Sequence, residues 1–330
     1  MNRYTYCANN PIRYYDPTGH WGVEVHGKKT SEILKVELNK YIKEESKNII
    51  VYKTDKKGNI SVDKKGNQIV DEKKTKTERD TWVKEQNKKV DGYVKAIVAG
   101  NLYVDQESTV FQRKDFESDS IFHGITTMYI QKVKEERKDK KYTLFVEERR
   151  QTAMSILTSP DIYKKEGAIK KFIVDPGVNM LKDNTKALDT SKASIEKDIE
   201  KGKFHNGKAT TYLFGEVRKD GKVVEEATKE SASLFVLGMG LHSLQDQQAH
   251  GNLKSSSDHN DEYNDIPKYD SWGYDESKGK IVVTEGNKRI TKTVADTRSY
   301  IKDFLYGDSS TPGCGSFLFE PNKYSLTNQK

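Results

Sequence analysis

The sequence predicts a mainly α-helical protein that is interrupted by short β-hairpins. Several stretches place apolar residues three and four positions apart, which is the spacing of one face of a helix. Shorter runs rich in Val, Ile and Tyr flank Gly-Asn or Asp-Gly pairs, which are the usual turn residues of hairpins. Aromatic side chains make up 10% of the 330 residues, a content that argues against wholesale disorder.

The first part of the chain contains a turn-rich tail, two helices and a hairpin. Residues 1–25 hold Asn-Pro and Asp-Pro-x-Gly sequences, which form turns. Thr30-Ser31-Glu32 predicts the N-terminal cap of a helix whose apolar face runs from Ile33 to Ile42. Residues 48–70 predict strand, turn and strand, and contain Asp-Lys-Lys-Gly-Asn twice. From Glu78 to Val98 the helical spacing returns.

The remainder of the chain alternates helices with hairpins. Helical spacing predicts further helices at residues 120–133, 144–157, 163–172, 225–250 and 294–305. Turn sequences predict a hairpin over residues 212–225, around Lys219-Asp220-Gly221-Lys222. They predict another over residues 280–293, around Glu285-Gly286-Asn287.

Composition excludes several classes of protein. Charged residues reach 32%, and the best apolar run, residues 234–241, is far shorter than the roughly 20 residues of a membrane span. Two cysteines make neither a disulfide scaffold nor a zinc ribbon, and the pairing of Cys7 with Cys314 stays open.

The formal net charge of +7 is unevenly distributed. Residues 51–90 hold 12 basic and 7 acidic residues, whereas residues 258–275 hold 6 acidic and 1 basic. Basic stretches of this kind meet phosphates, lipid headgroups or nucleic acid. This one lacks the pattern of Arg and interleaved aromatic residues of a base-reading surface, so we interpret it as a solvated lysine-rich hairpin.

The strongest helical stretch, residues 225–250, ends in a row of ionisable groups: His242, Asp246 and His250. Residues four apart on a helix differ by about 40° in rotation, so these three project from one side. Two imidazoles and a carboxylate are ligands that suit zinc. His242 and His250 lie about 12 Å apart along the axis, too far to share one ion. Two ions, with Asp246 as their bridge, fit this row better.

Each ion needs ligands from elsewhere in the chain. The remaining histidines are His20, His26, His123, His205 and His259. We favour His123, because it stands in the first turn of an expected helix. His205 lies in a turn, and His259 lies in a carboxylate-rich loop whose negative field favours a cation.

The competing interpretation is that these histidines are hydrogen-bonded core residues, which is the commoner role of a single helical histidine. The three-residue row at helical spacing favours metal binding instead. Gly238-x-Gly240 does not indicate a nucleotide loop, because a third glycine is missing. We interpret these glycines as positions of close helix packing.

Residues near the start of the chain resemble the end of an Rhs (YD-repeat) core. The resemblance is carried by Tyr4-x-Tyr6-x-x-Asn9-Asn10-Pro11-x-x-Tyr14-x-Asp16-Pro17-x-Gly19. In that family the segment closes a β-shell that encapsulates a variable C-terminal toxin domain. The resemblance implies that the chain is the C-terminal piece of a longer secreted polymorphic toxin. Its implied partners are the rest of the Rhs shell and a cognate immunity protein.

The histidine row resembles the metal-binding helix of bacterial zinc-dependent phospholipase C-like proteins. The matching residues are Gly238-x-Gly240-Leu241-His242-Ser243-Leu244-Gln245-Asp246-x-x-Ala249-His250. The resemblance implies a helical fold shared with single-strand-specific zinc nucleases, and two or three zinc ions. It implies that His242 and Asp246 are ligands, with Asp246 as the bridge. His250 matches the downstream ligand, and His123 matches an early histidine at a helix start.

Together these observations predict three regions and a function. The regions are an Rhs-like tail at 1–25, a helix plus lysine-rich β-hairpin region at 26–77, and a helical metal-dependent domain at 78–330. We expect a toxin that hydrolyses phosphodiesters, above all those of phospholipids at a membrane surface, with Asp119 or Asp265 orienting the attacking water. The alternatives are a zinc nuclease acting on single-stranded nucleic acid, and a non-catalytic binding effector whose histidine row is structural.

Overall fold

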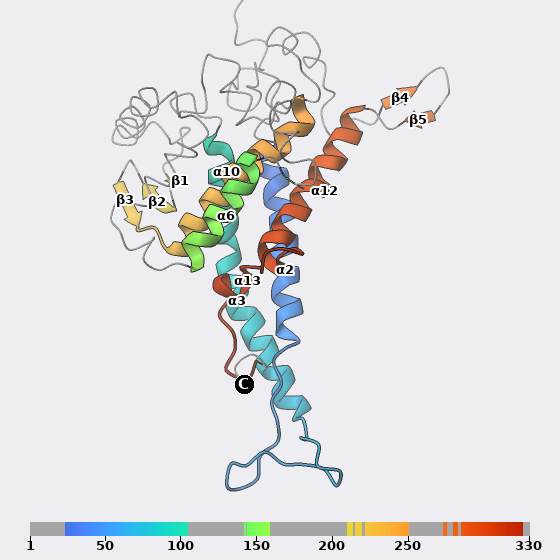
Figure 1. The fold of residues 1–330 in the computed structure, drawn as a ribbon, viewed down its shortest axis with the longest axis vertical. Coiled ribbons are helices and arrows are strands. Elements are labelled where there is room, and N and C mark those ends of the chain that lie inside the picture. Colours follow the sequence, from blue (N-terminus) through green and yellow to red (C-terminus); the bar gives the residue numbers. More distant parts are fainter. Residues whose placement is uncertain are drawn as a thin grey trace, which may run out of the picture. The chain divides into compact units, whose positions relative to one another are not determined.

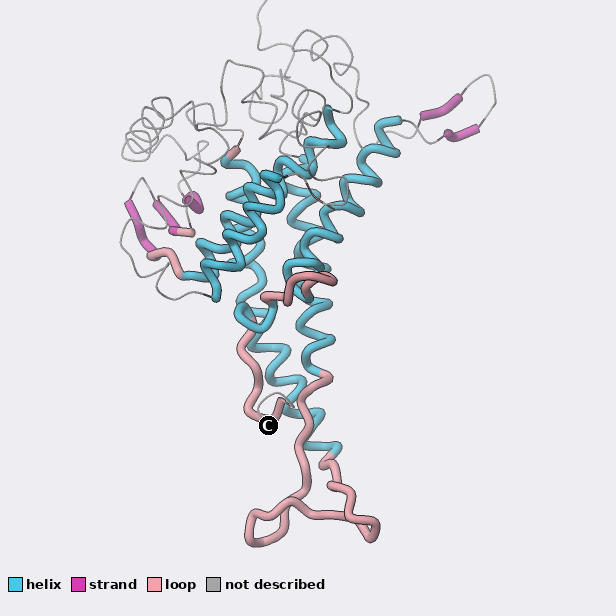
Figure 2. The backbone as a smooth tube through the Cα atoms, in the orientation of Figure 1, coloured by secondary structure: helices cyan, strands magenta, loops and turns pink. Residues whose placement is uncertain are grey.

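The computed structural model describes residues 24–104, 142, 144–158, 210–213, 215–219, 222–250, 273–275, 280–282 and 285–325. Within these residues the protein is mostly helical (Figures 1 and 2), which confirms the mainly α class. The predicted helices at 120–133 and 163–172, Cys7 and the Rhs-like motif lie outside the described residues. No helix among the described residues is both long and apolar enough to cross a bilayer.

The helical segments begin with the π-helix η2 (Glu24–Lys29), which continues directly into α2 (Thr30–Ser46). They continue with α3 (Glu72–Tyr103), α6 (Leu144–Thr158), α10 (Lys229–His250), α12 (Glu285–Tyr306) and the short α13 (Gly315–Leu318). The helices predicted from Glu78, over 144–157 and over 225–250 are therefore confirmed, although the last of them begins at Lys229 rather than at Glu225.

Two small antiparallel sheets accompany the helices. β1 (Thr210–Leu213), β2 (Glu216–Lys219) and β3 (Lys222–Glu225) form a three-stranded sheet in that order. The β2–β3 hairpin is the one predicted over residues 212–225. β4 (Gly273–Asp275) pairs with β5 (Lys280–Val282), so that Tyr274 lies opposite Ile281.

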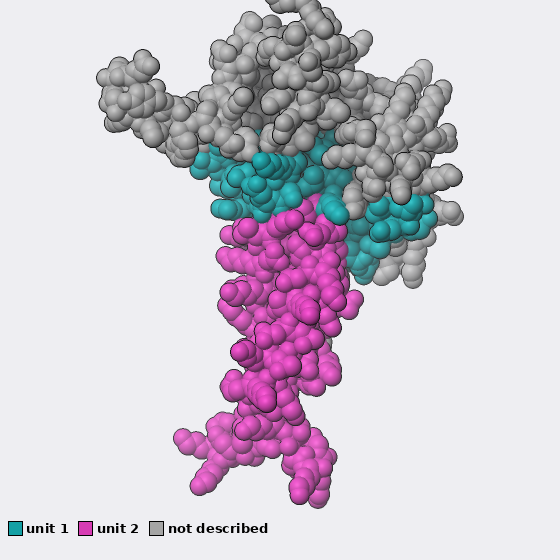
Figure 3. All heavy atoms as spheres, turned by 180° about the vertical axis from the view of Figure 1, so that it is seen from behind, with its two compact units in different colours: residues 1–33, 95–300 teal, residues 34–94, 301–330 magenta. Residues whose placement is uncertain are grey.

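The chain divides into two compact units, coloured separately in Figure 3. Unit 1 comprises Met1–Ile33 and Lys95–Tyr300, and unit 2 comprises Leu34–Val94 and Ile301–Lys330. Each unit draws on both of the sequence ranges 26–77 and 78–330, because α2, α3 and α12 each contribute residues to both units.

α10 forms the core of unit 1, and every residue from 232 to 246 is buried. A helix that is buried all round must be packed on several sides, and glycine allows its backbone to approach its neighbours. A Cβ on Gly238 would collide with the carbonyl oxygen of Ile97 on α3, and a Cβ on Gly240 would meet Arg149 of α6. The interpretation of these glycines as packing positions is confirmed.

Aromatic side chains form much of the core of unit 2. Phe319 lies 5.6 Å from both Tyr41 of α2 and Tyr93 of α3, measured between ring centroids. The Trp82 indole donates a hydrogen bond to the carbonyl of Glu320, and the Tyr93 hydroxyl donates to that of Leu318, both at 2.8 Å. The polar atom of each large ring is thereby satisfied while its apolar surface is covered.

Two predicted element boundaries are wrong. Thr30 does not cap a helix: its hydroxyl donates to the carbonyl of Val25 at 2.8 Å, and helical structure extends back to Glu24. The hairpin predicted over residues 280–293 is absent, because α12 begins at Glu285. Buried residues at helical spacing outweigh the Gly-Asn turn there: Ile290, Thr293, Thr297, Tyr300, Ile301 and Phe304.

Residues 51–71 form a compact set of turns, which we call the turn module, in place of the predicted continuous hairpin. Its extended parts are joined only by isolated bridges, such as Tyr52 with Val70 and Thr54 with Ile60. Gly58 and Gly66 have φ values of 87° and 84°, so the predicted turns do occur at these glycines.

Candidate metal centre

The histidine row lies in the buried part of unit 1. His242 and Asp246 project from α10, and the side chains of both are 0% exposed. His250 is the last residue of α10, but its side chain lies outside the described structure. His123, His205, His259, Asp119 and Asp265 also lie outside the described residues, so their predicted roles stay predictions.

A third buried residue that could ligate a metal is His26 of η2. His26 Nε2 lies 3.0 Å from Asp246 Oδ1, and His242 Nε2 lies 3.0 Å from Asp246 Oδ2. The two imidazole rings stack with their centroids 4.2 Å apart. One ligand atom from each of the three residues lies within 4.8 Å of the others, so the group could hold a metal ion.

Sequence reasoning counted His26 among the histidines but gave it no role. The cap predicted at Thr30 placed the start of the helix after His26, so His26 was left outside it. His26 lies four residues before Thr30 and eight before Leu34, so it falls on the buried face once the helical pattern is extended towards the N-terminus. That spacing is the signal that could have identified it.

Gln245, which is 1% exposed, fixes the orientation of the His26 ring. Thr30 gives its hydroxyl proton to the carbonyl of Val25, so Thr30 Oγ1 must accept from Gln245 Nε2 at 2.8 Å. The Gln245 amide also donates to Thr297 Oγ1 at 3.0 Å. These two contacts turn Gln245 Oε1 towards His26 Nδ1, 2.8 Å away.

Asn101 supports the same orientation of Gln245. Its Nδ2 donates to the backbone carbonyl of His26 at 3.2 Å and to Gln245 Oε1 at 3.0 Å. Gln245 Oε1 is therefore an acceptor for both Asn101 and His26, and His26 Nδ1 carries a proton. A histidine that ligates a metal commonly donates its other N–H to an oxygen in this way.

Because Nδ1 of His26 carries the proton, the chemical character of the His26–Asp246 contact depends on Nε2. In a neutral imidazole protonated at Nδ1, Nε2 is a bare acceptor. It lies 3.0 Å from a carboxylate oxygen, and the contact lacks hydrogen-bond geometry. Two acceptors this close require either a second proton on His26 or a cation that both can ligate.

Each N–O contact, made to a different oxygen of Asp246, is close to the ligand separation at a zinc ion, and one atom from each residue lies within 4.8 Å of the others. Zinc bonds of about 2.0–2.1 Å place tetrahedral ligand atoms roughly 3.3–3.4 Å apart. The two N–O contacts of 3.0 Å are slightly shorter than this separation. Two histidines and one aspartate leave a fourth position, which in catalytic zinc sites takes water or substrate.

Buried positive charge lies along the neighbouring helix α6. Burial lowers the pKa of Arg149 to about 10, but this still leaves the guanidinium charged at neutral pH. Arg150 makes two contacts with Glu147, at 3.1 and 2.9 Å. The Tyr300 hydroxyl donates to the carbonyl of Val146 at 3.2 Å, and burial raises the pKa of Tyr300.

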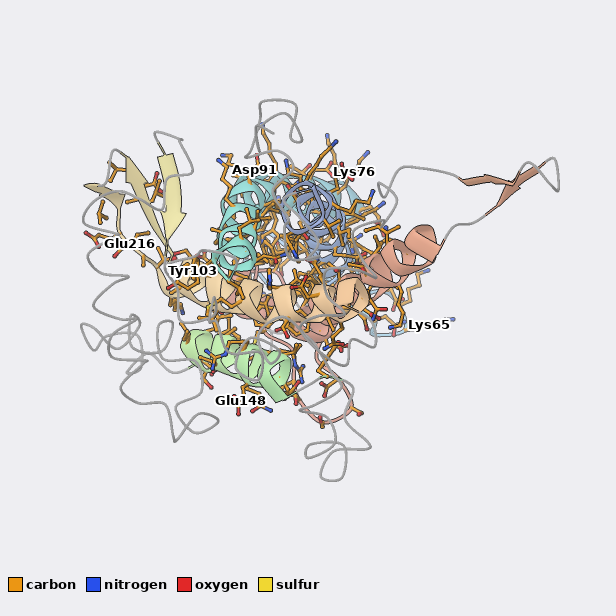
Figure 4. All side chains as sticks on the ribbon, turned by 90° about the horizontal axis from the view of Figure 1, so that it is seen from above. Lys65, Lys76, Asp91, Tyr103, Glu148 and Glu216 are labelled. Carbon is orange, nitrogen blue, oxygen red and sulfur yellow. The ribbon has the colours of Figure 1, made fainter. Side chains whose placement is uncertain are left out.

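The end of α3 that supplies Asn101 is held by aromatic packing. Tyr103 of α3, which is labelled in Figure 4, meets Phe235 of α10 edge to face, with the ring centroids 5.4 Å apart. Burial raises the pKa of the Tyr103 phenol, which therefore stays neutral. The described side chains that contact His26 or Gln245 include those of His242, Asp246, Asn101, Thr30 and Thr297, and all of them lie on helices within unit 1.

Comparisons with known proteins found no family model, no curated protein and no solved structure that matches this chain.

Proposed function

We propose that the chain is a zinc-dependent hydrolase in which His26, His242 and Asp246 bind an ion. The observation that carries the proposal is the contact between His26 Nε2 and Asp246 Oδ1, two acceptors 3.0 Å apart without hydrogen-bond geometry. Gln245 supports it by holding the Nδ1 proton of His26 and directing Nε2 towards Asp246. Further ions at His250, His123, His205 or His259 belong to the same proposal.

The residues of the cluster would each have a distinct task. Bound zinc supplies a Lewis acid and lowers the pKa of its water towards about 7. His26 and His242 supply neutral Nε2 ligands, and Asp246 supplies a negative charge that offsets part of the charge of the ion. Gln245 prevents the His26 ring from rotating, and the complete burial of the ligands keeps competing water away from them.

We propose phosphodiesters as substrates, above all those of phospholipids, because of the residue pattern around His242 and Asp246. That pattern resembles zinc-dependent phospholipase C-like proteins and includes an aspartate with access to two ions. Asp246 has this character, since its two oxygens lie beside different histidines. A toxin delivered from an Rhs shell is the biological setting that the first twenty residues suggest.

Burial favours a second candidate, a structural ion. His26, His242 and Asp246 are all 0% exposed. Structural zinc sites are closed, whereas catalytic sites keep a position open to substrate. In this case the ion would join η2 to α10 and stabilise the fold without catalysis.

Metal analysis tests the claim that both candidates share, which is that His26, His242 and Asp246 bind an ion. After dialysis, the wild-type protein should retain zinc, and His26→Ala and Asp246→Ala should lose it. Gln248→Ala is the matched control, because Gln248 lies on the same helix and contacts Asp296 rather than the cluster. A wild-type protein that retains no zinc and keeps its stability in chelator would contradict metal binding and favour a second proton on His26.

Activity assays then separate the candidates. Zinc-loaded protein should hydrolyse phosphatidylcholine vesicles, and His242→Ala should abolish the reaction. Cleavage of single-stranded DNA or RNA without lipid hydrolysis would replace the lipid assignment with a nuclease. Retained zinc with neither activity, together with a large loss of stability in chelator, would identify the ion as structural.

A further inference from the structure

The turn module of unit 2 is held together by backbone hydrogen bonds rather than by a core of its own. Lys53 N donates to Ile69 O, Ile69 N donates to Ser61 O, and Ser61 N donates to Lys53 O, at 2.8–2.9 Å. The three residues are eight positions apart, and their bonds form a closed ring. Such a ring fixes the module although most of its side chains are exposed.

Two turns of identical sequence project from this ring; we call residues 55–59 and 63–67 the lysine turns. In the first, Asp55 Oδ1 accepts from the backbone of Lys57 at 2.8 Å and of Asn59 at 2.9 Å. In the second, Asp63 makes the equivalent bonds at 2.7 and 2.9 Å. The hydrogen bonds lower the pKa of both carboxyls, so the turns are held in one conformation at neutral pH.

The lysine turns present unpaired positive charge. Lys56, Lys57, Lys64 and Lys65 are exposed and form no ion pair with any residue that the structure describes. Residues 51–70 contain five lysines and two aspartates, a difference of +3. Both aspartates are engaged by the backbone of their own turns, so the lysine ammonium groups remain open to an external anion.

Apolar side chains lie between the two turns. Ile60 and Val62 are 46% and 56% exposed, which is unusual for residues of this kind. They belong to the segment that joins the lysine turns, and therefore lie among the four lysines in the sequence. Lysine beside exposed aliphatic groups is the combination found at the surface of bilayers containing acidic lipid.

The base of the module anchors it to the helices of unit 2. Asp71 N donates to Val51 O, and Val51 N donates to the Thr75 hydroxyl, at 2.8 and 2.9 Å. Arg79 of α3 donates to the carbonyls of Ile49 and Lys47. As Figures 1 and 2 show, the two loops extend beyond the ends of α2 and α3, so a flat surface can approach both.

We propose that the lysine turns dock unit 2 onto a bilayer that contains anionic phospholipid. A flat, multiply charged surface can meet both turns at once, and Ile60 and Val62 can enter its headgroup region. Single-stranded nucleic acid fits less well, because the module contains no arginine and its one aromatic ring, that of Tyr52, is half-buried and therefore poorly placed for base stacking. The docking is independent of the metal cluster and therefore of the proposed hydrolase activity.

The test is sedimentation of the full chain with vesicles of phosphatidylcholine, with and without phosphatidylserine, in chelator so that no reaction occurs. The quadruple substitution of Lys56, Lys57, Lys64 and Lys65 by Gln should weaken binding to the mixed vesicles by roughly 100-fold or more. The matched control replaces four lysines of α3 by Gln, and so removes the same charge from elsewhere in unit 2. These are Lys73, Lys76, Lys84 and Lys88. The control should weaken binding less than tenfold.

Three results would overturn the proposal. They are an equal loss in the control, equal binding to vesicles without phosphatidylserine, and stronger binding to single-stranded DNA than to either vesicle. The double substitution Ile60→Ser and Val62→Ser supplies a second measure, because it should remove the part of the binding that survives high salt. Circular dichroism verifies that each variant is folded. The spectra should be unchanged, because these exposed side chains contribute little to the stability of the fold.

Discussion

In unit 1, the Gln245 side chain contacts residues of four helical segments: His26 of η2, Thr30 of α2, Asn101 of α3 and Thr297 of α12. In unit 2, the Asp55 and Asp63 side chains contact only residues of their own turns, no more than four positions away. In both arrangements, each polar atom of the central side chain has a hydrogen-bond partner. The first depends on the whole of unit 1 being folded, whereas each turn depends on five consecutive residues, so substitutions should have very different effects.

The largest effect is expected at Asp246. Replacing it with Ala removes the group that both stacked imidazoles face, so the buried Nε2 atoms of His26 and His242 lose that polar neighbour. A buried polar group that loses its partner costs about 1–3 kcal/mol, so the two histidines together should cost about 2–6 kcal/mol. Urea denaturation should show this loss, while Gln248→Ala on the same helix should change the free energy of unfolding by less than about 0.5 kcal/mol. Equal effects of the two substitutions would contradict a central role for Asp246.

Gln245→Leu should rank second. It leaves buried donors or acceptors on His26, Asn101, Thr30 and Thr297 without this partner, at about 1–3 kcal/mol for each group that water cannot reach. It should also weaken metal binding by about 10–100-fold, as loss of a hydrogen bond to a ligating histidine does elsewhere. The visible spectrum of Co²⁺-substituted protein reports the ligand geometry. A lower stability with an unchanged spectrum would show that Gln245 supports the fold but does not position His26.

Substitution of two glycines, Gly238 of α10 and Gly92 of α3, should change the stability of the protein by smaller amounts and in opposite directions. Gly238→Ala brings a methyl group against the carbonyl of Ile97 and should destabilise by about 1–3 kcal/mol. Gly92 of α3 has nothing within 4 Å of its added Cβ, so Gly92→Ala should stabilise by about 0.5–1 kcal/mol. Thermal melts of the two variants should shift in opposite directions. A stabilised Gly238→Ala would mean that α3 and α10 are less closely packed than described.

The smallest effect on overall stability is expected from Asp55 and Asp63. Their pKa values are lowered, first by the backbone hydrogen bond from Asn59 or Asn67, so the charged form holds each turn. This local stabilisation is present above the pKa of the unfolded chain and is lost as the pH falls through the lowered value. Amide exchange at Asn59 and Asn67 should accelerate over that acidic range, or in Asp55→Ala and Asp63→Ala at neutral pH. Exchange that does not change would show that the side chains do not hold the turns.

The same contrast explains what the sequence could predict. His242 and Asp246 were recognisable because their contact spans four residues of one helix, and the lysine turns because their glycines and aspartates act locally. His26 meets Gln245, which is 219 positions away, so only the tertiary fold brings them together. The turn predicted at Gly286-Asn287 failed for a related reason: burial of one face of α12 outweighed local turn propensity. Phosphodiester hydrolysis and the Rhs setting stay predictions.

The π-helical turn that carries His26 has a consequence for how the length of the chain can vary. Removing or adding one residue between His26 and Lys29 would rotate His26 by roughly a quarter of a turn around the helix axis relative to α2, away from Asp246. Insertions at the tips of the lysine turns would not change the orientation of any side chain in unit 1. Natural variants of this protein should therefore differ in length within residues 55–67 far more readily than within the six residues of η2.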